Sequence, residues 1–416
     1  MNFKKLKISL ISQFISQSIK VIITLFIGSL TVRYLGPEGV GKLSYSIALI
    51  GILAPFGALG IRGSLSSLLC EIEDNKDLVI TAFYLKLIGS FAIGLILIPI
   101  FFFETDIQLK NLYICVFFAN LFNAGEVFEI KLLNNNEGQK VALTTLIQNI
   151  AFAISSLLLV YFKAPLSLFG IVYAFQFFLR ALFNTYFANL YKYSKKFLTP
   201  NLRKAKELLK RGWPLVFTGF TVMIYTKSDQ IMLSFLGANM SEIGQYSIAV
   251  RIIGALYFIP VVISKTYLPF VGKESSHFSK NKVLKKLYRI SWISGLGLTF
   301  ICLFIFPKLV APIFGRQYLE SEIILSILSP SLFAINLGCA NSTWLNTNNF
   351  QKQILLKSII GAVSNILLNF ILIPKFGLVG ASVSTLIGIY LSVFGIIFSN
   401  KKIRLNIVKL VYPFQT

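Results

Sequence analysis

The sequence contains few acidic residues and almost no histidine. Among 416 residues, 16 are Asp or Glu and one is histidine, whereas 40 are Lys or Arg. The charged fraction is 13%, about half of what soluble domains carry. The single histidine, His277, lies in a basic loop, so the chain offers little for acid–base catalysis. We expect no catalytic residues.

Cysteine and phosphate-loop signals are equally sparse. The four cysteines lie far apart, three of them inside apolar runs, which predicts neither a disulfide framework nor a metal site. The glycines of residues 35–41 lie between apolar runs, without the strand that a nucleotide-binding loop follows. We therefore expect no cofactor and no ATP hydrolysis by this chain.

Long apolar runs dominate what is present. The hydrophobic fraction is 55% and the mean hydropathy is +0.74, values typical of a chain whose solvent is lipid. The first run is too long for a signal-peptide core, and we read it as an anchor that stays. Runs long enough to cross a bilayer occupy residues 8–32, 40–59, 78–103, 109–133, 141–162, 166–190, 213–236, 244–270, 290–314, 323–345, 354–373 and 377–399. The fold class is therefore all-α, with about twelve transmembrane helices.

The basic residues give the orientation. With the amino terminus in the cytoplasm, the cytoplasmic segments hold 26 Lys and Arg residues and the opposite loops hold 6. This imbalance follows the positive-inside rule and predicts a multi-pass protein with both termini cytoplasmic. Most of the net charge of +24 thus sets topology, and no nucleic-acid partner is needed to explain it.

An internal repeat divides the chain. Residues 35–48 read LGPEGVGKLSYSIA and residues 236–249 read LGANMSEIGQYSIA, matching at one fixed offset. Six spans per half is an even number, so the repeat is parallel. The sequence predicts a six-helix lobe over 1–190, a basic cytoplasmic linker over 191–212, a second six-helix lobe over 213–400 and a cytoplasmic tail over 401–416. The repeated turns of Gly36, Pro37 and Gly237 are candidates for an outer gate.

The first helix of each half carries a polar stripe. Steps of three and four residues place each set on one helix face. The stripes are Gln13, Gln17, Lys20 and Thr24 in the first span, and Thr218, Thr221, Tyr225 and Asp229 in the seventh. Matched stripes favour a shared cavity, with polar helix packing as the alternative. Lys20, near the centre of its span, is the strongest candidate for a cavity residue.

Charges inside spans are costly and therefore informative. Asp229 and Arg251 lie at comparable depth, which predicts a salt bridge that is either fixed or altered during an ion-coupled cycle. Lys86 and Arg180 are candidates to bind the substrate in the cavity. They lie at the level of Glu126 and Glu129, which are candidates to neutralise them and to couple an ion.

The remaining intramembrane lysines and prolines add detail. Lys265, Lys308 and Lys357 lie near span ends, from which their amines can reach the interface. Overall the interior leans basic, which suits an anionic ligand such as a phosphate. Proline is expected to bend the second, eighth and ninth spans.

Three segments resemble the polysaccharide flippases. They read RYLGPEGVGKLSYSIALIG at 33–51, KSDQIMLSFLG at 227–237 and LIPKFGLVGASVSTLIG at 372–388. The chain resembles the O-antigen and lipid-linked-oligosaccharide transporters of the multidrug/oligosaccharidyl-lipid/polysaccharide exporter superfamily, over essentially its whole length.

The resemblance implies two lobes around a cavity that opens alternately to either side of the bacterial inner membrane. The implied substrate is an undecaprenyl-diphosphate-linked O-antigen or capsule oligosaccharide, exchanged against H⁺ or Na⁺. A polysaccharide polymerase and a chain-length regulator are implied partners of a monomeric transporter in membrane lipid. Lys20, Arg251 and Asp229 are the positions that match these roles, and Tyr225 is a further candidate for substrate contact.

Two alternatives remain. A multidrug or cation antiporter of the same superfamily would need a cavity rich in carboxylates, and this interior has few. A membrane polysaccharide polymerase or ligase would need an outer active site, for which the short outer loops leave little room.

Overall fold

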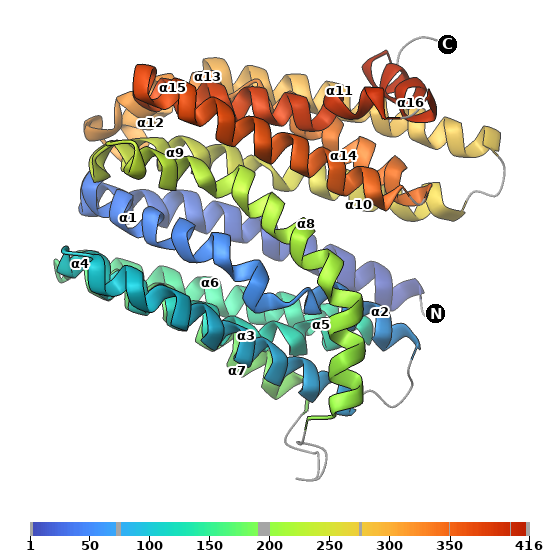
Figure 1. Cartoon of the computed structure of the whole chain (residues 1–416), viewed down its shortest axis with the longest axis horizontal. Helices are drawn as coiled ribbons and strands as arrows, with labels where there is room; N and C mark the ends of the chain where they lie inside the picture. The colour runs from blue at the N-terminus through green and yellow to red at the C-terminus, as the bar shows by residue number, and fades with distance from the viewer. Residues whose placement is uncertain are drawn as a thin grey trace. The chain divides into compact units, whose positions relative to one another are not determined.

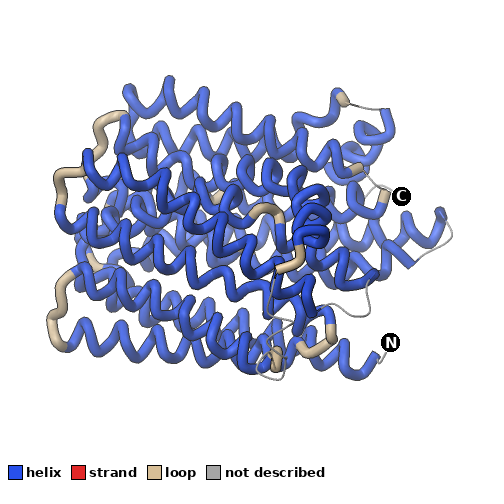
Figure 2. The backbone as a smooth tube through the Cα atoms, turned by 60° about the horizontal axis from the view of Figure 1, so that its bottom comes forward, coloured by secondary structure: helices blue, strands red, loops and turns tan. Residues whose placement is uncertain are grey.

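The computed structural model describes residues 3–71, 76–189, 200–273, 277–348, 350–399 and 401–412. Within these ranges, the side chains of residues 3–26, 268–270, 272–273, 277–280, 351 and 398 are not described. The described chain is helical, with short turns and no strand (Figure 2). The predicted all-α class is confirmed.

The chain divides into two units by its internal contacts. Unit 1 consists of Met1–Leu35 and Lys42–Met223, and unit 2 of Gly36–Gly41 and Ile224–Thr416. The division falls inside a long helix, α8, and not in the predicted linker at 191–212. Each unit is described below by itself.

The helices of unit 1 are coloured from blue to green in chain order (Figure 1). They are α1 (Phe3–Ala58), α2 (Ile61–Glu71), α3 (Lys76–Phe103), α4 (Ile107–Phe122), the 3₁₀ turn η1 (Asn123–Gly125), α5 (Glu126–Asn134), α6 (Gly138–Tyr161), α7 (Leu166–Phe187) and most of α8 (Leu202–Phe235).

Unit 2 takes the last turns of α8 and the helices that follow. These are α9 (Met240–Leu256), α10 (Phe258–Lys273), α11 (His277–Phe304), α12 (Phe306–Phe314), the 3₁₀ turn η4 (Arg316–Tyr318), α13 (Glu320–Leu328), α14 (Ser331–Thr347), α15 (Gln351–Phe394), η5 (Gly395–Phe398) and α16 (Lys401–Val411).

Glycines make the reversals between spans. In the repeated turns, Gly36 has φ 69° and Gly237 has φ 100°, and Gly377 has φ 52° within α15. Side chains other than glycine rarely adopt such angles, so a Leu-Gly pair can end one span and begin the next with almost no loop. Both predicted turns are confirmed. The first consists of a single non-helical residue inside α1.

The described helices correspond to the twelve predicted spans. Nine described stretches are long and apolar enough to cross a membrane, and one of them, residues 352–397, contains the two spans joined at Gly377. The part of α1 before Gly36 and the part of α8 beyond Gly212 supply the other two predicted spans. The protein is a multi-pass membrane protein.

Proline breaks two spans where the sequence predicts bends. Pro260 has no N–H to donate to the carbonyl of Leu256, and the helix stops there, with Tyr257 between α9 and α10. Pro307 opens α12 after the break at Ile305. The polar fourth span is also interrupted, by η1, while keeping its predicted extent.

Both the basic segment before the seventh span and the carboxyl tail form helices where the structure describes them. Residues 202–212 continue without a break into the seventh span as α8, and Arg211 pairs with Glu71 at 2.7 Å within unit 1. The predicted tail forms α16, which docks on unit 2 through Ile403, Ile407 and Leu410.

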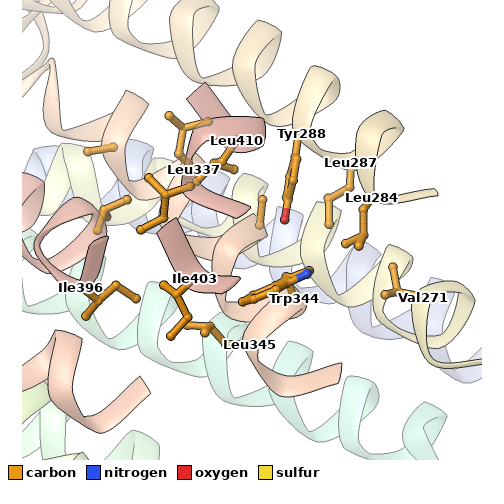
Figure 3. Packing of buried hydrophobic residues seen from close by; sticks show 14 residues of the cluster. Val271, Leu284, Leu287, Tyr288, Leu337, Trp344, Leu345, Ile396, Ile403 and Leu410 are labelled. Carbon is orange, nitrogen blue, oxygen red and sulfur yellow. The ribbon is translucent and has the colours of Figure 1, made fainter. Parts of the chain in front are cut away.

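A core of 14 buried residues holds α16 in place (Figure 3). Leu410 and Ile403 of α16 lie near Tyr288 of α11 and Trp344 of α14. The Tyr288 hydroxyl donates to Asn406 Oδ1 at 2.6 Å, so α16 is attached by a polar contact as well as by packing.

Candidate functional site

Asp229 of α8 lies at the centre of a polar cluster in unit 2. Its side chain is buried, with a residue exposure of 3%. Oδ1 accepts from Asn365 Nδ2 at 2.9 Å and from Asn369 Nδ2 at 2.7 Å. Oδ2 accepts from the Tyr246 hydroxyl at 2.7 Å and from Thr385 Oγ1 at 2.7 Å. Each carboxylate oxygen thus has two neutral donors, drawn from α9 and from both arms of α15.

The reversal of α15 brings these donors together. Gly377 folds the helix back, so that the arm carrying Asn365 runs beside the arm carrying Thr385. At Gly388 an added Cβ would lie 3.2 Å from the Asn365 Cβ, tighter than ordinary contact. Glycine there lets the two arms approach closely enough for one carboxylate to bind both.

The cluster retains one unused acceptor beside the carboxylate. Asn365 Oδ1 accepts from Ser228 Oγ at 2.8 Å and from Asn369 Nδ2 at 3.2 Å. The side-chain oxygen Oδ1 of Asn369 is buried and has no hydrogen-bond partner among the described residues. Carboxylate, amide and hydroxyl oxygens are the ligands that hard cations take in proteins. The arrangement is chemically suited to a small cation.

Arg251 does not reach Asp229. All four donors to the carboxylate are neutral, and no hydrogen bond or ion pair joins Arg251 to any described residue. The predicted salt bridge is therefore absent from this structure, and a pairing in another conformation of the cycle stays a prediction. The reason is rotation about the helix axis: at 100° per residue, Arg251 lies about 140° around α9 from Tyr246, which faces Asp229.

Arg251 and Lys227 of unit 2 form no ion pair with a described residue. Lys227 lies within electrostatic range of both Arg251 and Asp229, but forms no ion pair or hydrogen bond with a described residue. Both side chains are half-buried. Tyr225, one half-turn earlier on α8, is half-buried within range of Cys339.

Unit 1 contains an ion-paired cluster instead. Lys86 of α3 is 3% exposed, and its Nζ lies 2.6 Å from Glu126 Oε2. Arg62 of α2 also pairs with Glu126. Arg180 of α7 donates through Nε to Glu129 Oε2 at 3.0 Å, with a second bond from its guanidinium. The predicted neutralisation of Lys86 and Arg180 by the two glutamates is confirmed.

The interrupted fourth span positions these glutamates. The turn η1 offsets α5 from α4, so Glu126 and Glu129 fall in the first turn of a new helix. Gly125 packs against Ala181 so tightly that an added Cβ would lie 2.5 Å from the alanine Cβ. This contact brings α5 against α7 and places Glu129 beside Arg180.

The stripe of the first span lies outside the described residues. Gln13, Gln17, Lys20 and Thr24 belong to α1, but the side chains of residues 3–26 are not described. Their placement in a cavity stays a prediction. Gly36, Pro37 and Gly237 lie in reversals, as predicted, and their role as a gate also stays a prediction.

The fold and family follow from comparison with known proteins. The profile of the family described as Polysaccharide biosynthesis protein matches residues 6–274. The chain belongs to this family.

Two curated relatives extend over most of the chain. The capsular polysaccharide biosynthesis protein CapF of Staphylococcus aureus is 24% identical, over 89% of this chain and 93% of its own length. A Haloferax volcanii protein named "Probable low-salt glycan biosynthesis flippase Agl15" is 24% identical, over 85% of this chain and 74% of its own.

Two solved structures share the fold. A multidrug resistance transporter of the MATE family, in the MOP superfamily, superposes with a TM-score of 0.73 at 14% identity, covering 98% of this chain and 100% of its own. The lipid II flippase MurJ gives a TM-score of 0.73 at 20% identity, covering 97% and 92%. At these identities the two structures establish the fold alone.

Proposed function

We propose that the protein is a flippase that moves a lipid-linked oligosaccharide across the membrane in which it lies. The substrate is an undecaprenyl-diphosphate-linked O-antigen or capsule unit, carried from the cytoplasmic to the periplasmic leaflet by alternating access. Membership of a polysaccharide biosynthesis family and the names of the relatives support this substrate class.

One structural observation carries the proposal. Arg251 and Lys227 are half-buried cations that form no ion pair with a described carboxylate, in a helical unit where an unmatched charge is costly. A ligand that brings its own negative charge offsets this cost. The diphosphate of the carrier lipid, or the acid groups of its sugars, supply that charge in a form that Arg binds well.

The Asp229 cluster is assigned to ion coupling. A proton or a sodium ion entering the cluster would displace the donors to the carboxylate, and the open Asn369 oxygen provides a further ligand. Because Asp229 binds α8, α9 and both arms of α15 at once, occupancy would change how these helices are held together. Coupling needs such a difference in affinity between two states.

Complementation tests the flippase proposal. The wild-type gene should restore surface polysaccharide in a strain that lacks its own flippase, and Arg251→Ala and Lys20→Ala should reduce it. Full restoration by both variants would remove these residues from the mechanism. No restoration by the wild type, in strains making several different glycans, would count against the function itself.

A drug antiporter is the second candidate. The fold is shared with a multidrug transporter, and unit 2 contains a buried carboxylate. However, Arg251, Lys227 and Lys357 of the same unit form no ion pair with a described carboxylate, and such a basic interior disfavours an organic cation. Unchanged drug susceptibility of a deletion strain would separate the two functions.

The inner-membrane location, the cytoplasmic placement of both termini and a monomeric state complete the proposal. The loop charges support the orientation. A polysaccharide polymerase and a chain-length regulator are the partners that would consume the flipped product.

A further inference from the structure

Lys357, on α15, is a third cation of unit 2 that forms no ion pair with a described residue. Rather than extending toward the end of its span, the side chain turns to α14. Its Nζ donates to Ser342 Oγ at 2.6 Å and to the Gly338 carbonyl at 3.3 Å. Both partners are neutral, and no carboxylate among the described side chains pairs with this amine. One of its three N–H groups therefore has no acceptor among the described residues.

A second open donor lies close by. The Tyr257 hydroxyl accepts from Cys339 Sγ at 4.0 Å, and its own proton has no acceptor among the described residues. Tyr257 is 42% exposed, because the break that Pro260 causes between α9 and α10 leaves its ring at the surface of the unit. Cys339 is the residue after Gly338 and lies within electrostatic range of Lys357.

Three elements converge on this point. Lys357 comes from α15, Tyr257 from the junction of α9 and α10, and Tyr225 from α8, each within range of Cys339 on α14. A cation beside hydroxyl donors, without a carboxylate to compete, fits an oxyanion. The tyrosine rings add flat apolar surface of the kind that sugars and isoprenoid chains contact.

We propose that Lys357 and Tyr257 form a subsite for one oxyanion group of the transported headgroup, with Ser342 orienting the lysine. The inference rests on the flippase function proposed above and names a binding residue for it. The oxyanion is either a phosphate of the carrier or a carboxylate of an acidic sugar.

The position of the subsite links it to the Asp229 cluster. Lys357 and Asn365 lie eight residues apart on the same uninterrupted arm of α15, about 12 Å along its axis. Headgroup and coupling ion would therefore act on one rigid helix. A shift of this helix arm when a ligand binds at Lys357 would therefore also move Asn365.

Binding to the purified full-length protein tests the subsite. The probes are farnesyl diphosphate, farnesol as the same chain without charge, and glucuronate as a carboxylate without the chain. Farnesyl diphosphate or glucuronate should raise the Tm of the wild type, and farnesol should raise it less. Whichever anion acts identifies the source of the oxyanion. No shift with either anion overturns the proposal.

Variants separate binding from helix packing. We expect Lys357→Gln to raise the Kd for the active anion at least tenfold, Tyr257→Phe to raise it about threefold, and Lys357→Arg to retain most affinity. Lys308→Gln, on the exposed face of α12, is the matched control and should bind as the wild type does. If Lys357 only joins α15 to α14, Lys357→Gln lowers the ligand-free Tm and leaves the Kd unchanged, which overturns the subsite.

The complementation assay keeps the two proposals apart. A wild type that restores surface polysaccharide, together with a Lys357→Gln variant of unchanged Kd, would leave the flippase function standing and remove the subsite. A wild type that binds the anion through Lys357 and restores no glycan would keep the subsite and remove the flippase.

Discussion

In unit 1 the intramembrane cations Lys86 and Arg180 lie against carboxylates, whereas in unit 2 cations and carboxylate are kept apart. Glu126 and Glu129 neutralise the first pair. In unit 2, Asp229 is surrounded by neutral donors, and Arg251, Lys227 and Lys357 form no ion pair with any carboxylate that the structure describes. Both units share one repeat, so the difference is not imposed by the fold.

The comparison separates two uses of buried charge. A closed ion pair satisfies its members inside the protein and leaves little affinity for a ligand, although removing one member is costly. Separated charges leave both signs available, one for an anion and one for a cation. We infer that the cluster of unit 1 holds helices together and that the charges of unit 2 bind what is transported.

Asp229→Asn should have the largest effect. Without the charge the cluster loses its preference for a cation, and we expect transport in the complementation assay to fall about 100-fold, near the upper end of typical coupling energies. Ion dependence of the Tm, measured in sodium against choline salts, should disappear in the same variant. Asp77→Asn, at the start of α3, is the control. Transport at the wild-type level in Asp229→Asn would exclude coupling at this cluster.

Glu126→Ala should destabilise unit 1. It leaves Lys86 buried without an acidic partner, with only the Asn123 carbonyl at 3.3 Å to accept from its amine, at a cost of about 3 kcal/mol in the free energy of unfolding. The double variant Lys86→Met with Glu126→Leu removes both charges and should recover most of the stability, measured by thermal unfolding. It should also transport. A stable double variant that fails to transport would show that unit 1 uses these charges in the transport cycle. The proposed structural role of this cluster would then be wrong.

Arg251→Gln should affect transport without affecting stability. Loss of one charged hydrogen bond to the substrate corresponds to about a tenfold fall in transport. Because no carboxylate depends on this cation, the Tm should stay the same or rise. Lys375→Gln, in the exposed reversal of α15, should change neither quantity. A large fall in Tm for Arg251→Gln would mean that the arginine is structural.

The smallest effect is expected at Asp106, outside the spans. Asp106 caps α4 by accepting from the Gln108 N–H at 2.7 Å and pairs with Lys42 at 2.8 Å. Burial alone would raise the pKa of Asp106, but the hydrogen bonds from Lys42 and from the Gln108 backbone lower it overall.

The lowered pKa sets the pH window. The stabilisation is complete above about pH 4, the unfolded value, and is lost as the pH falls through the lower folded value. Asp106→Asn retains the cap but not the ion pair, so it should cost about 0.5 kcal/mol at pH 7. The Tm difference from the wild type should shrink in acid. An unchanged difference at about pH 3 would assign the effect to the cap and not to the charge.

The sequence predicts the parts of the fold that depend on local pattern. Apolar runs and loop charges locate the spans, and the repeated Leu-Gly turns locate reversals that only glycine adopts readily. Prolines predict the breaks at Tyr257 and Ile305, because a proline lacks the N–H that would form a hydrogen bond within its own helix. The pairing of Glu126 with Lys86 could be predicted because the two residues have opposite charge and lie at the same depth in the membrane.

The partners of Asp229 could not be predicted in this way. Depth in the membrane alone predicted Arg251 as the partner of Asp229. Contact also depends on rotation about each helix axis and on which helices are neighbours. Asn365 and Asn369 share a helix face, four residues apart, and the other residues of 365–373 are apolar. That spacing was the available signal, and the reversal at Gly377 that adds Thr385 is a tertiary feature.

The docked carboxyl-terminal helix has a practical consequence for anyone who tags this protein. Asn406 of α16 donates to Asn341 Oδ1 at 3.1 Å while accepting from Tyr288, so cutting the chain after Ser399 would strand two buried polar groups. A reporter or purification tag should therefore be appended beyond Tyr412, with α16 intact. A truncation that removes α16 would report on a damaged unit 2 and not on membrane topology.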